Sequence, residues 1–132
     1  MSSLFVYGTL MCTDIAKAVL GRTIQVEPAR LKGYRRYSLA GESYPAVAAS
    51  PNGVVEGHLW RGLSARDIQA LDDFEGELYE RHHITVQLGS SEEIAADVYV
   101  IREESKHLLR EAPWDRDKFE KDDKDRFLRE FL

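Results

Sequence analysis

The fold predicted for the whole chain depends on the stretch Ser3-Leu4-Phe5-Val6-Tyr7-Gly8-Thr9-Leu10-Met11. Residues 4–7 are continuously apolar or aromatic, which is typical of a strand buried on both faces, although a short buried helix gives the same pattern. Gly8 ends the run and indicates a sharp turn or the close approach of another group. The backbone N–H groups of residues 8–10 are then free to face a ligand as a small anion nest. Taken alone, the stretch is also explained by a plain strand followed by a turn.

Length and composition indicate one globular domain that spans residues 1–132. A chain of this size can bury a core, and its 43% hydrophobic and 31% charged residues are those of an ordinary folded protein. No apolar run approaches the roughly 18 residues of a membrane span, and no secretory signal is visible. The single cysteine, Cys12, cannot form an internal disulfide and fits a reducing compartment. We therefore expect a cytoplasmic monomer that has no membrane partner.

The charge balance argues against a nucleic-acid partner. The formal net charge is −5, whereas binding to a phosphate backbone needs a basic surface. Arg30, Lys32, Arg35 and Arg36 form a local basic run, but such runs are usually solvated faces of strands or loops. We therefore expect a small-molecule partner and no nucleic acid.

Periodicity and turn residues give a coarse map of the elements. Helices are predicted from residue 13 or 14 to 20, over 64–75, and as an amphipathic helix in the charged C-terminal tail. Strands are predicted over 23–31, 37–39, 55–60, 78–88 and 94–101, with turns at 41–45, 51–53 and 89–91. The last two strands are expected to form a hairpin, because only a short turn separates them.

The helix predicted over 64–75 carries a glutamate on its apolar stripe. Glu75 lies seven residues after Ile68 and four after Leu71, so the three side chains share one face. Burial disfavours the charged carboxylate, and the C-terminal end of a helix favours cations, so both effects raise the pKa of Glu75. A raised pKa suits a general base that works near neutral pH. Two alternatives stay open: the helix ends before Glu75, or Glu75 forms a structural salt bridge with Arg81.

Other residues that could carry chemistry give weaker signals. His82 and His83 are neighbours on a predicted strand and point to opposite faces, which does not suit one metal ion. Cys12 has no histidine at a diagnostic spacing. The aspartates of the tail lack the glycine and the terminal glutamate of an EF-hand loop, and no phosphate-binding glycine motif is present. We therefore expect no metal and no cofactor.

Two stretches together resemble the γ-glutamylcyclotransferase-like family, in particular its AIG2-like and γ-glutamylamine cyclotransferase branch. The first is Val6-Tyr7-Gly8-Thr9-Leu10-Met11. The second is Leu71-Asp72-Asp73-Phe74-Glu75-Gly76, followed by Tyr79 and Arg81. Supporting matches are Tyr44-Pro45-Ala46-Val47, Val55-Glu56-Gly57-His58-Leu59, and Trp114 with Phe127-Leu128, so the resemblance covers nearly the whole chain.

The resemblance implies an α+β fold with a small mixed, barrel-like sheet and a pocket at its mouth. It implies that the loop at residues 7–10 holds a γ-glutamyl group through backbone N–H groups, and that Glu75 is the acid/base residue of a cyclisation that yields 5-oxoproline and an amine. The substrate-binding residues that it implies are Val6, Tyr7, Gly8, Thr9, Leu10, Met11, Tyr79 and Arg81. Tyr44, with Tyr34 as a further candidate, is added because its residue type and its place near a motif suit a pocket wall.

Three further functions stay open on the sequence. The same pocket in a non-catalytic module would bind a small metabolite or a chain terminus, because no second catalytic group is evident. An enzyme of narrower role would remove a γ-glutamyl protecting group during biosynthesis. A protein-interaction module would act through the charged C-terminal helix. The signatures name neither the γ-glutamyl compound nor the amine.

Overall fold

Strand β1 (Ser2–Val6) is buried on both faces in the computed structural model, which describes residues 1–132. Leu4 and Val6 enter a core of 19 buried residues shared with the helices. Phe5 and the following Tyr7 enter a second core of 11 buried residues, drawn from all five long strands. The predicted strand is therefore confirmed, and the alternative of a short buried helix is wrong.

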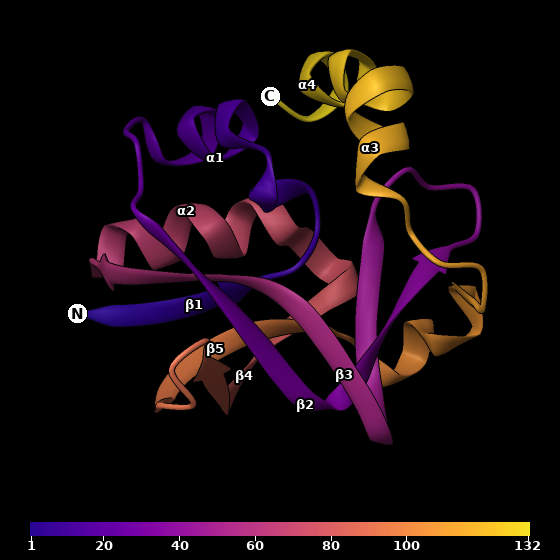
Figure 1. The fold of residues 1–132 in the computed structure, drawn as a ribbon. Coiled ribbons are helices and arrows are strands. Elements are labelled where there is room, and N and C mark those ends of the chain that lie inside the picture. Colours follow the sequence, from indigo (N-terminus) through magenta and orange to yellow (C-terminus); the bar gives the residue numbers. More distant parts are fainter.

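Five strands close into a mixed barrel around the second core (Figure 1). The order is β3-β1-β5-β4-β2, and β2 pairs back to β3. β1 is antiparallel to β3 and parallel to β5, and every other pair is antiparallel. The other strands are β2 Val26–Leu39, β3 Pro45–Leu63, β4 Tyr79–Leu88 and β5 Glu93–Ile101. The short β6, Leu109–Arg110, pairs antiparallel with the end of β2. The predicted α+β fold with a barrel-like sheet is confirmed.

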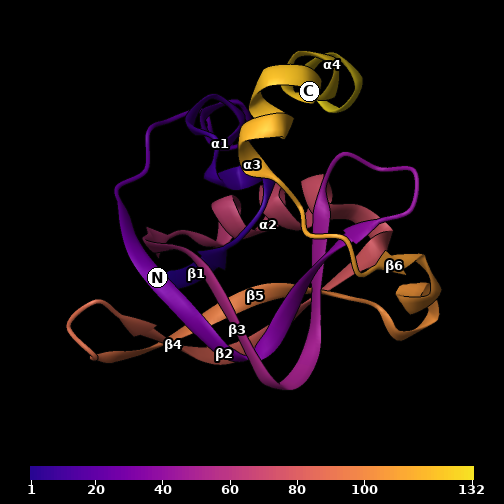
Figure 2. The same ribbon diagram turned by 45° about the vertical axis from the view of Figure 1, so that its right-hand side comes forward.

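The helices gather on one side of this barrel. Figures 1 and 2 show α1 and the C-terminal helices at the top of the molecule, α2 below them, and β4 and β5 lower still. The bounds are α1 Thr13–Leu20, α2 Ala65–Glu75, α3 Arg116–Lys118 and α4 Lys124–Phe131, with the 3-10 helices η1 Thr9–Met11, η2 Gly76–Leu78 and η3 Glu103–Leu108 and the π-helical turn η4 Phe119–Asp123. No helix is long and apolar enough to cross a membrane.

Local capping determines both ends of α2 as predicted. The Asp67 N–H donates to Ser64 Oγ at 3.1 Å, and the Ser64 N–H donates to the Asp67 carboxylate at 3.0 Å. This reciprocal capping box starts the helix, and Gly76 follows its last residue. One correction concerns α1: Cys12 is its N-cap, without a side-chain hydrogen bond, rather than Thr13 or Asp14.

The strands predicted over 23–31 and 37–39 form the single strand β2. Gly33 takes a φ of 87°, and the pairing of β2 with β3 shifts register between Lys32 and Tyr34 instead of ending there. Glycine adopts this left-handed conformation without a steric penalty, so the strand continues through an irregularity. The sequence predicts two short strands because Gly33 interrupts the regular strand pattern between them.

The turn predicted at 51–53 is wrong, because these residues lie inside β3. Their turn-forming residues make the bulge opposite Gly33, where four residues of β3 (50–53) face one residue of β2. A Cβ on Gly53 would lie 2.2 Å from the Tyr34 carbonyl oxygen, so the glycine permits a close backbone approach. The pairing with β2 therefore outweighs the local turn preference.

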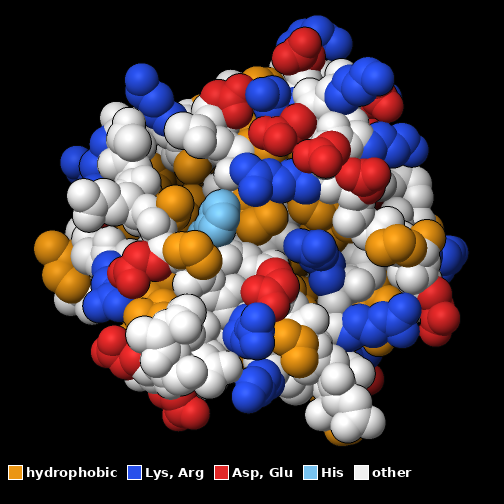
Figure 3. Space-filling model, viewed as in Figure 1, with side chains coloured by type: hydrophobic (Ala, Val, Ile, Leu, Met, Phe, Trp, Pro, Cys, Tyr) orange, Lys and Arg blue, Asp and Glu red, His pale blue; other side chains and the backbone are white.

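The amphipathic C-terminal helix is confirmed, with an interruption. The π-helical turn η4 separates α3 from α4, yet Phe119, its first residue, and Phe127 in α4 are both buried. Trp114, just before α3, is buried and packs 5.8 Å from the Phe119 ring. The opposite face is charged, and Figure 3 shows Asp, Glu, Lys and Arg side chains mixed over these helices. This segment is part of the folded core.

Gly57 should tolerate no larger residue, because β1 occupies the space above it. A Cβ on Gly57 would lie 2.3 Å from the Val6 carbonyl oxygen and 2.8 Å from the Phe5 ring. We expect Gly57→Ala to lower the free energy of unfolding by about 3 kcal/mol or more, since backbone cannot move aside as a flexible side chain can. Urea denaturation measures the change.

Gly89→Ala is the matched control. No atom lies within 4 Å of a Cβ at Gly89, and the residue does not adopt a positive φ. We expect this variant to change the free energy of unfolding by less than about 0.5 kcal/mol. Equal effects of the two substitutions would contradict the packing of β1 against β3.

Candidate active site

A pocket lies where the end of β1 meets the end of α2. It encloses about 600 Å³, counting the space open to solvent, which is within the usual size range of ligand pockets. Glu75, the last residue of α2, is the only charged side chain in its wall. The other lining residues are Phe5, Val6, Tyr7, Gly8, Thr9, Leu10, Tyr44, Pro45, Phe74, Tyr79, Tyr99, Phe127 and Phe131.

The structure brings most of the predicted site residues together. Residues 6–10, Tyr44, Glu75 and Tyr79 all line this pocket. Met11 and Arg81 do not: Met11 lines a neighbouring cavity, and Arg81 is held in ion pairs outside the pocket. Tyr34 packs against the barrel core.

The corner after β1 presents backbone donors. In η1 the Met11 N–H donates to the Gly8 carbonyl, and the Cys12 N–H donates to the Thr9 carbonyl, both at 2.9 Å. The N–H groups of Thr9 and Leu10 precede these bonds and have no partner within η1. Residues 8–10, where the sequence predicts an anion nest, thus line the pocket.

A side chain of β2 holds the peptide unit between Tyr7 and Gly8 in place. Arg36 Nη1 donates to the Tyr7 carbonyl oxygen at 2.8 Å, so the Gly8 N–H of the same planar unit points the opposite way. A Cβ on Gly8 would lie 2.9 Å from Pro45 Cγ, which explains why glycine occupies this corner. Arg36 and Pro45 thus fix the orientation of the backbone donors.

The environment of Glu75 changes its acidity. Burial in the aromatic pocket raises its pKa from 4.5 to about 8, and the negative charge of Asp72 one turn earlier adds to this effect. No ion pair to Glu75 is formed, and the salt bridge to Arg81 that the sequence left open is therefore absent. The carboxyl can gain and lose a proton near neutral pH, as acid/base catalysis requires.

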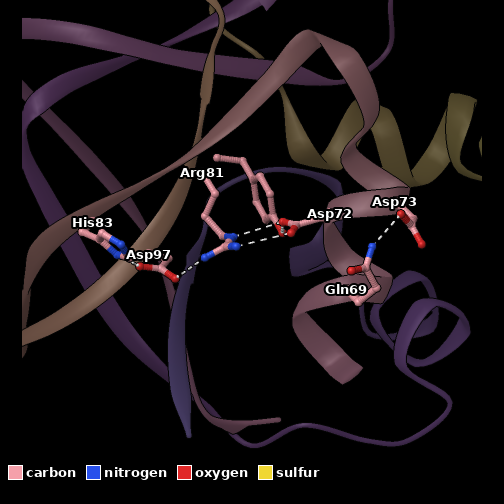
Figure 4. A network of polar contacts seen from close by, with 7 residues as sticks. Gln69, Asp72, Asp73, Arg81, His83 and Asp97 are labelled. Atoms are coloured by element: carbon pink, nitrogen blue, oxygen red, sulfur yellow. Dashed lines mark hydrogen bonds and ion pairs between the residues drawn. The ribbon is translucent and has the colours of Figure 1, made fainter. Parts of the chain in front are cut away.

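Asp72 lies in a network that keeps it ionised (Figure 4). Arg81 Nε donates to its carboxylate at 3.0 Å, and the Tyr99 hydroxyl donates to it at 2.7 Å. Burial alone would raise the pKa of Asp72, but these hydrogen bonds and the charge of Arg81 outweigh it and lower the pKa. Arg81 also donates to Asp97 at 3.0 Å, and His83 contacts that same carboxylate. The network ties α2 to β4 and β5.

The comparison with known proteins identifies the family. Residues 4–116 match the family described as gamma-glutamyl cyclotransferase, AIG2-like. The chain belongs to the AIG2-like gamma-glutamyl cyclotransferase family. Protein AIG2 C of Arabidopsis thaliana is 36% identical over 99 residues, which are 74% of this chain and 60% of that relative. The match therefore spans less than two thirds of the relative's length.

Solved structures share the fold of this AIG2-like protein. A solution structure of an Arabidopsis thaliana protein is 30% identical, with a TM-score of 0.76 over 98% of this chain and 79% of that one. A structure named gamma-glutamyl cyclotransferase is 18% identical, with a TM-score of 0.71 over 85% of this chain and 70% of that one. The second likeness concerns the fold alone.

The tyrosine hydroxyls at the pocket of this AIG2-like protein donate to backbone. The Tyr7 hydroxyl donates to the Tyr99 carbonyl, and the Tyr79 hydroxyl donates to the Pro45 carbonyl, both at 2.7 Å. Burial raises the pKa of both phenols well above the ordinary value, so they stay protonated. They shape the wall, and Glu75 is the lining residue whose pKa lies near neutral pH. No three His, Cys, Asp or Glu side chains gather in a way that could hold a metal ion.

Aromatic rings from distant segments cover the mouth of the pocket. Tyr44 lies 6.1 Å from Phe127 and 6.0 Å from Phe131 between ring centroids, and Phe74 lies 6.0 Å from Phe127, all in edge-on geometry. The sequence predicts an amphipathic helix in the C-terminal tail but does not predict that Phe127 and Phe131 line this pocket. The 3.6-residue period shows which face is apolar, whereas the docking position of α4 depends on the tertiary fold.

Glu75 should make the stability of this AIG2-like protein fall as pH rises. Between pH 4.5 and about 8, Glu75 holds a proton in the folded state that it has released in the unfolded state. The free energy of unfolding is therefore highest below pH 4.5 and decreases as pH rises to about 8. Glu75→Gln removes this loss. We expect its gain over the wild type to be on the order of 3 kcal/mol larger at pH 9 than at pH 4 in urea denaturation.

The exposed neighbour Glu77 provides the control for this measurement. Glu77→Gln should show a much smaller pH-dependent difference, because solvent screens an exposed carboxylate. A wild type and a Glu75→Gln variant with the same pH dependence would contradict the raised pKa.

Proposed function

We propose that this chain converts a γ-glutamyl amine or peptide to 5-oxoproline and a free amine. In this reaction the α-amino nitrogen attacks the γ-carbonyl carbon, a five-membered ring closes, and the bond from that carbon to the amine nitrogen breaks. The observation that carries the proposal is Glu75, a single ionisable side chain with its pKa raised to about 8, facing the same pocket as the η1 backbone. The family assignment supports it.

Glu75 is proposed to move the proton in both halves of the reaction. As a carboxylate it takes a proton from the substrate's α-ammonium, which frees the nitrogen lone pair for attack. As a carboxylic acid it returns that proton to the leaving amine nitrogen. A pKa near the working pH serves both steps, because neither the base nor the acid form is then rare. When the lactam forms, the ring nitrogen loses a second proton, and this proton also goes to the departing amine, which leaves as an ammonium ion and closes the proton balance.

The η1 corner is proposed to bind the negative oxygens. No lysine or arginine lines the pocket, so the α-carboxylate and the oxyanion that develops on the γ-carbonyl rely on N–H donors. The backbone at residues 8–10 supplies them. Donors fixed before the reaction stabilise developing charge without reorganising. Holding both ends of one molecule also favours ring closure, since the attacking and attacked atoms are already covalently linked.

The aromatic rings at the mouth are proposed to hold the leaving amine. Tyr44, Phe74, Phe127 and Phe131 offer apolar faces and edges there, with no cation in the pocket that would pair with a second carboxylate. Substrates with an uncharged amine portion are therefore favoured over peptides. We place the activity in the cytoplasm, because the chain has one cysteine, which is free, and forms no internal disulfide.

Glu75→Gln should abolish turnover while the pocket remains. Glutamine keeps the size and the hydrogen bonding of the side chain but cannot accept the proton. We expect kcat for 5-oxoproline release from a panel of γ-glutamyl amines to fall by about 10²–10⁴-fold. Glu77→Gln, a change of the same type at an exposed position two residues away, should leave kcat unchanged.

The binding of a γ-glutamyl amine to the two forms separates the proposal from a non-catalytic module. Equal affinity with turnover only in the wild type supports Glu75 as the acid/base group. Binding without product in either form would support the alternative of a metabolite-binding module in the same pocket.

Asp72 should tune the pH at which the enzyme gains activity. The base form of Glu75 accumulates as pH rises, so kcat/KM should increase toward a plateau above about pH 8. Asp72→Asn removes the second cause of the raised pKa and should move this rise to lower pH, though not to the ordinary glutamate value, because burial remains. Asp73→Asn at the adjacent exposed position is the control. An unshifted profile in Asp72→Asn would argue against Glu75 as the base.

A further inference from the structure

A second cavity lies beside the candidate active site, between α1, the start of β2 and β3. It encloses about 490 Å³, counting the space open to solvent. Leu10 of η1 lines both spaces, and Met11 lines the second one only. Figure 3 looks onto this side of the molecule and shows hydrophobic side chains and a histidine at the surface between α1 and the strands. The cavity is thus separate from the pocket that holds Glu75.

Three nitrogen atoms in this region have no hydrogen-bond partner. They are His58 Nδ1, Trp60 Nε1 and Arg116 Nε, and they are the only buried side-chain nitrogen or oxygen atoms in the chain that lack one. All three residues line the second cavity. A buried donor without a partner costs about 1–3 kcal/mol, and native proteins seldom leave several together. Trp60 Nε1 and Arg116 Nε are donors, and His58 Nδ1 is a donor in one of its two tautomers, so a ligand or water that accepts from them would satisfy them.

The two tryptophans differ in whether the indole N–H has a hydrogen-bond acceptor. Trp114 Nε1 donates to the Ser43 carbonyl at 2.7 Å, whereas Trp60, which is fully buried, has no acceptor for its indole N–H. An indole nitrogen can only donate, so the missing partner must be an acceptor. The ligand therefore presents oxygen atoms toward β3.

The charge of the cavity is positive. Lys17, Arg22 and Arg116 line it, and no aspartate or glutamate does, although the chain as a whole carries a net charge of −5. Arg22 is paired with Asp67 at 2.5 Å, and Arg116 Nε lies 3.8 Å from a Glu120 oxygen. Lys17 makes no ion pair. A lining of this kind favours an acceptor that is also negatively charged.

We propose that this cavity binds a small organic anion, with a carboxylate or phosphate head on a short apolar body. The oxygens of the head accept hydrogen bonds from Trp60 Nε1 and Arg116 Nε, and from His58 in the tautomer that carries its proton on Nδ1, while Lys17 contributes charge at the rim. The apolar body lies against the hydrophobic side chains of the wall, among them Ile24 and Val26. The apolar side chain of Val26 is 49% exposed, and a bound apolar group would reduce this exposure.

The second site is connected to the first through η1. Arg116 Nη2 donates to the Met11 carbonyl at 3.0 Å, and Leu10 separates the two spaces. A ligand that draws Arg116 toward its own oxygens acts on the residue that ends η1. The anion therefore influences the orientation of the backbone donors at residues 8–10. Binding itself does not depend on the proposed cyclisation, so the two proposals fail independently.

The indole N–H signals in a two-dimensional ¹H–¹⁵N NMR spectrum test the proposal on the whole chain. The protein has two tryptophans, and Trp114→Phe assigns the signals. We expect titration with butyrate or butyl phosphate to shift the Trp60 signal downfield to saturation while the Trp114 signal stays in place. Butyramide, which has the size of butyrate without its charge, should produce no saturable shift. The anion that saturates identifies the head group.

Two lysine variants test whether the charge of Lys17 contributes to anion binding. Lys17→Gln should weaken the Kd of the anion by about three- to fivefold, the usual effect of one exposed ion pair. Lys32→Gln, which removes an exposed lysine that does not line the cavity, should leave the Kd unchanged. The absence of a saturable Trp60 shift with both anions, or an equal shift with butyramide, would overturn the proposal and leave water as the acceptor.

Discussion

The burial of β1 on both faces is the constraint on which the structure depends. Leu4 and Val6 anchor the strand in the core beneath the helices, while Phe5 and Tyr7 anchor it inside the barrel. With β3 on one side and β5 on the other, the strand has no free edge, and Gly57 lets it approach β3 closely. The corner that follows at Gly8 therefore has a fixed position, and so do the N–H groups of η1. A site built on such a corner is rigid on one side before any ligand arrives.

The other side of the site comes from two carboxylates one helical turn apart. Asp72 is surrounded by donors from Arg81 and Tyr99 and stays ionised, whereas Glu75 faces aromatic rings and has its pKa raised to about 8. Environments that move two such pKa values apart suit the carboxylates to different roles, and under the proposed function Glu75 has the acid/base one. The ion-pair network thus serves Glu75 indirectly, because it positions the end of α2 and keeps a negative charge beside it.

Local signals in the sequence account for much of this arrangement. The capping residues of α2 and the unbroken apolar run of β1 act over a few residues, so both elements could be predicted from the chain alone. The apolar stripe of α2 also identified Glu75. The partners of Arg81 could not be predicted, because they depend on the register in which β4 and β5 pair, which places Arg81 opposite Tyr99. The turn signal at 51–53 misled for the same reason, since long-range pairing with β2 outweighed local preference.

The contribution of α4 to the pocket has an evolutionary consequence. Phe127 and Phe131 lie beyond residue 116, where the match to the family ends, whereas Glu75 and the η1 corner lie within it. Under the proposed function, proton transfer would depend on residues inside the matched range, and contact with the departing amine would depend partly on residues beyond it. Phe127 also belongs to the core, whereas Phe131 is 49% exposed. Variation at Phe131 would therefore change the surface offered to the amine on an unchanged barrel.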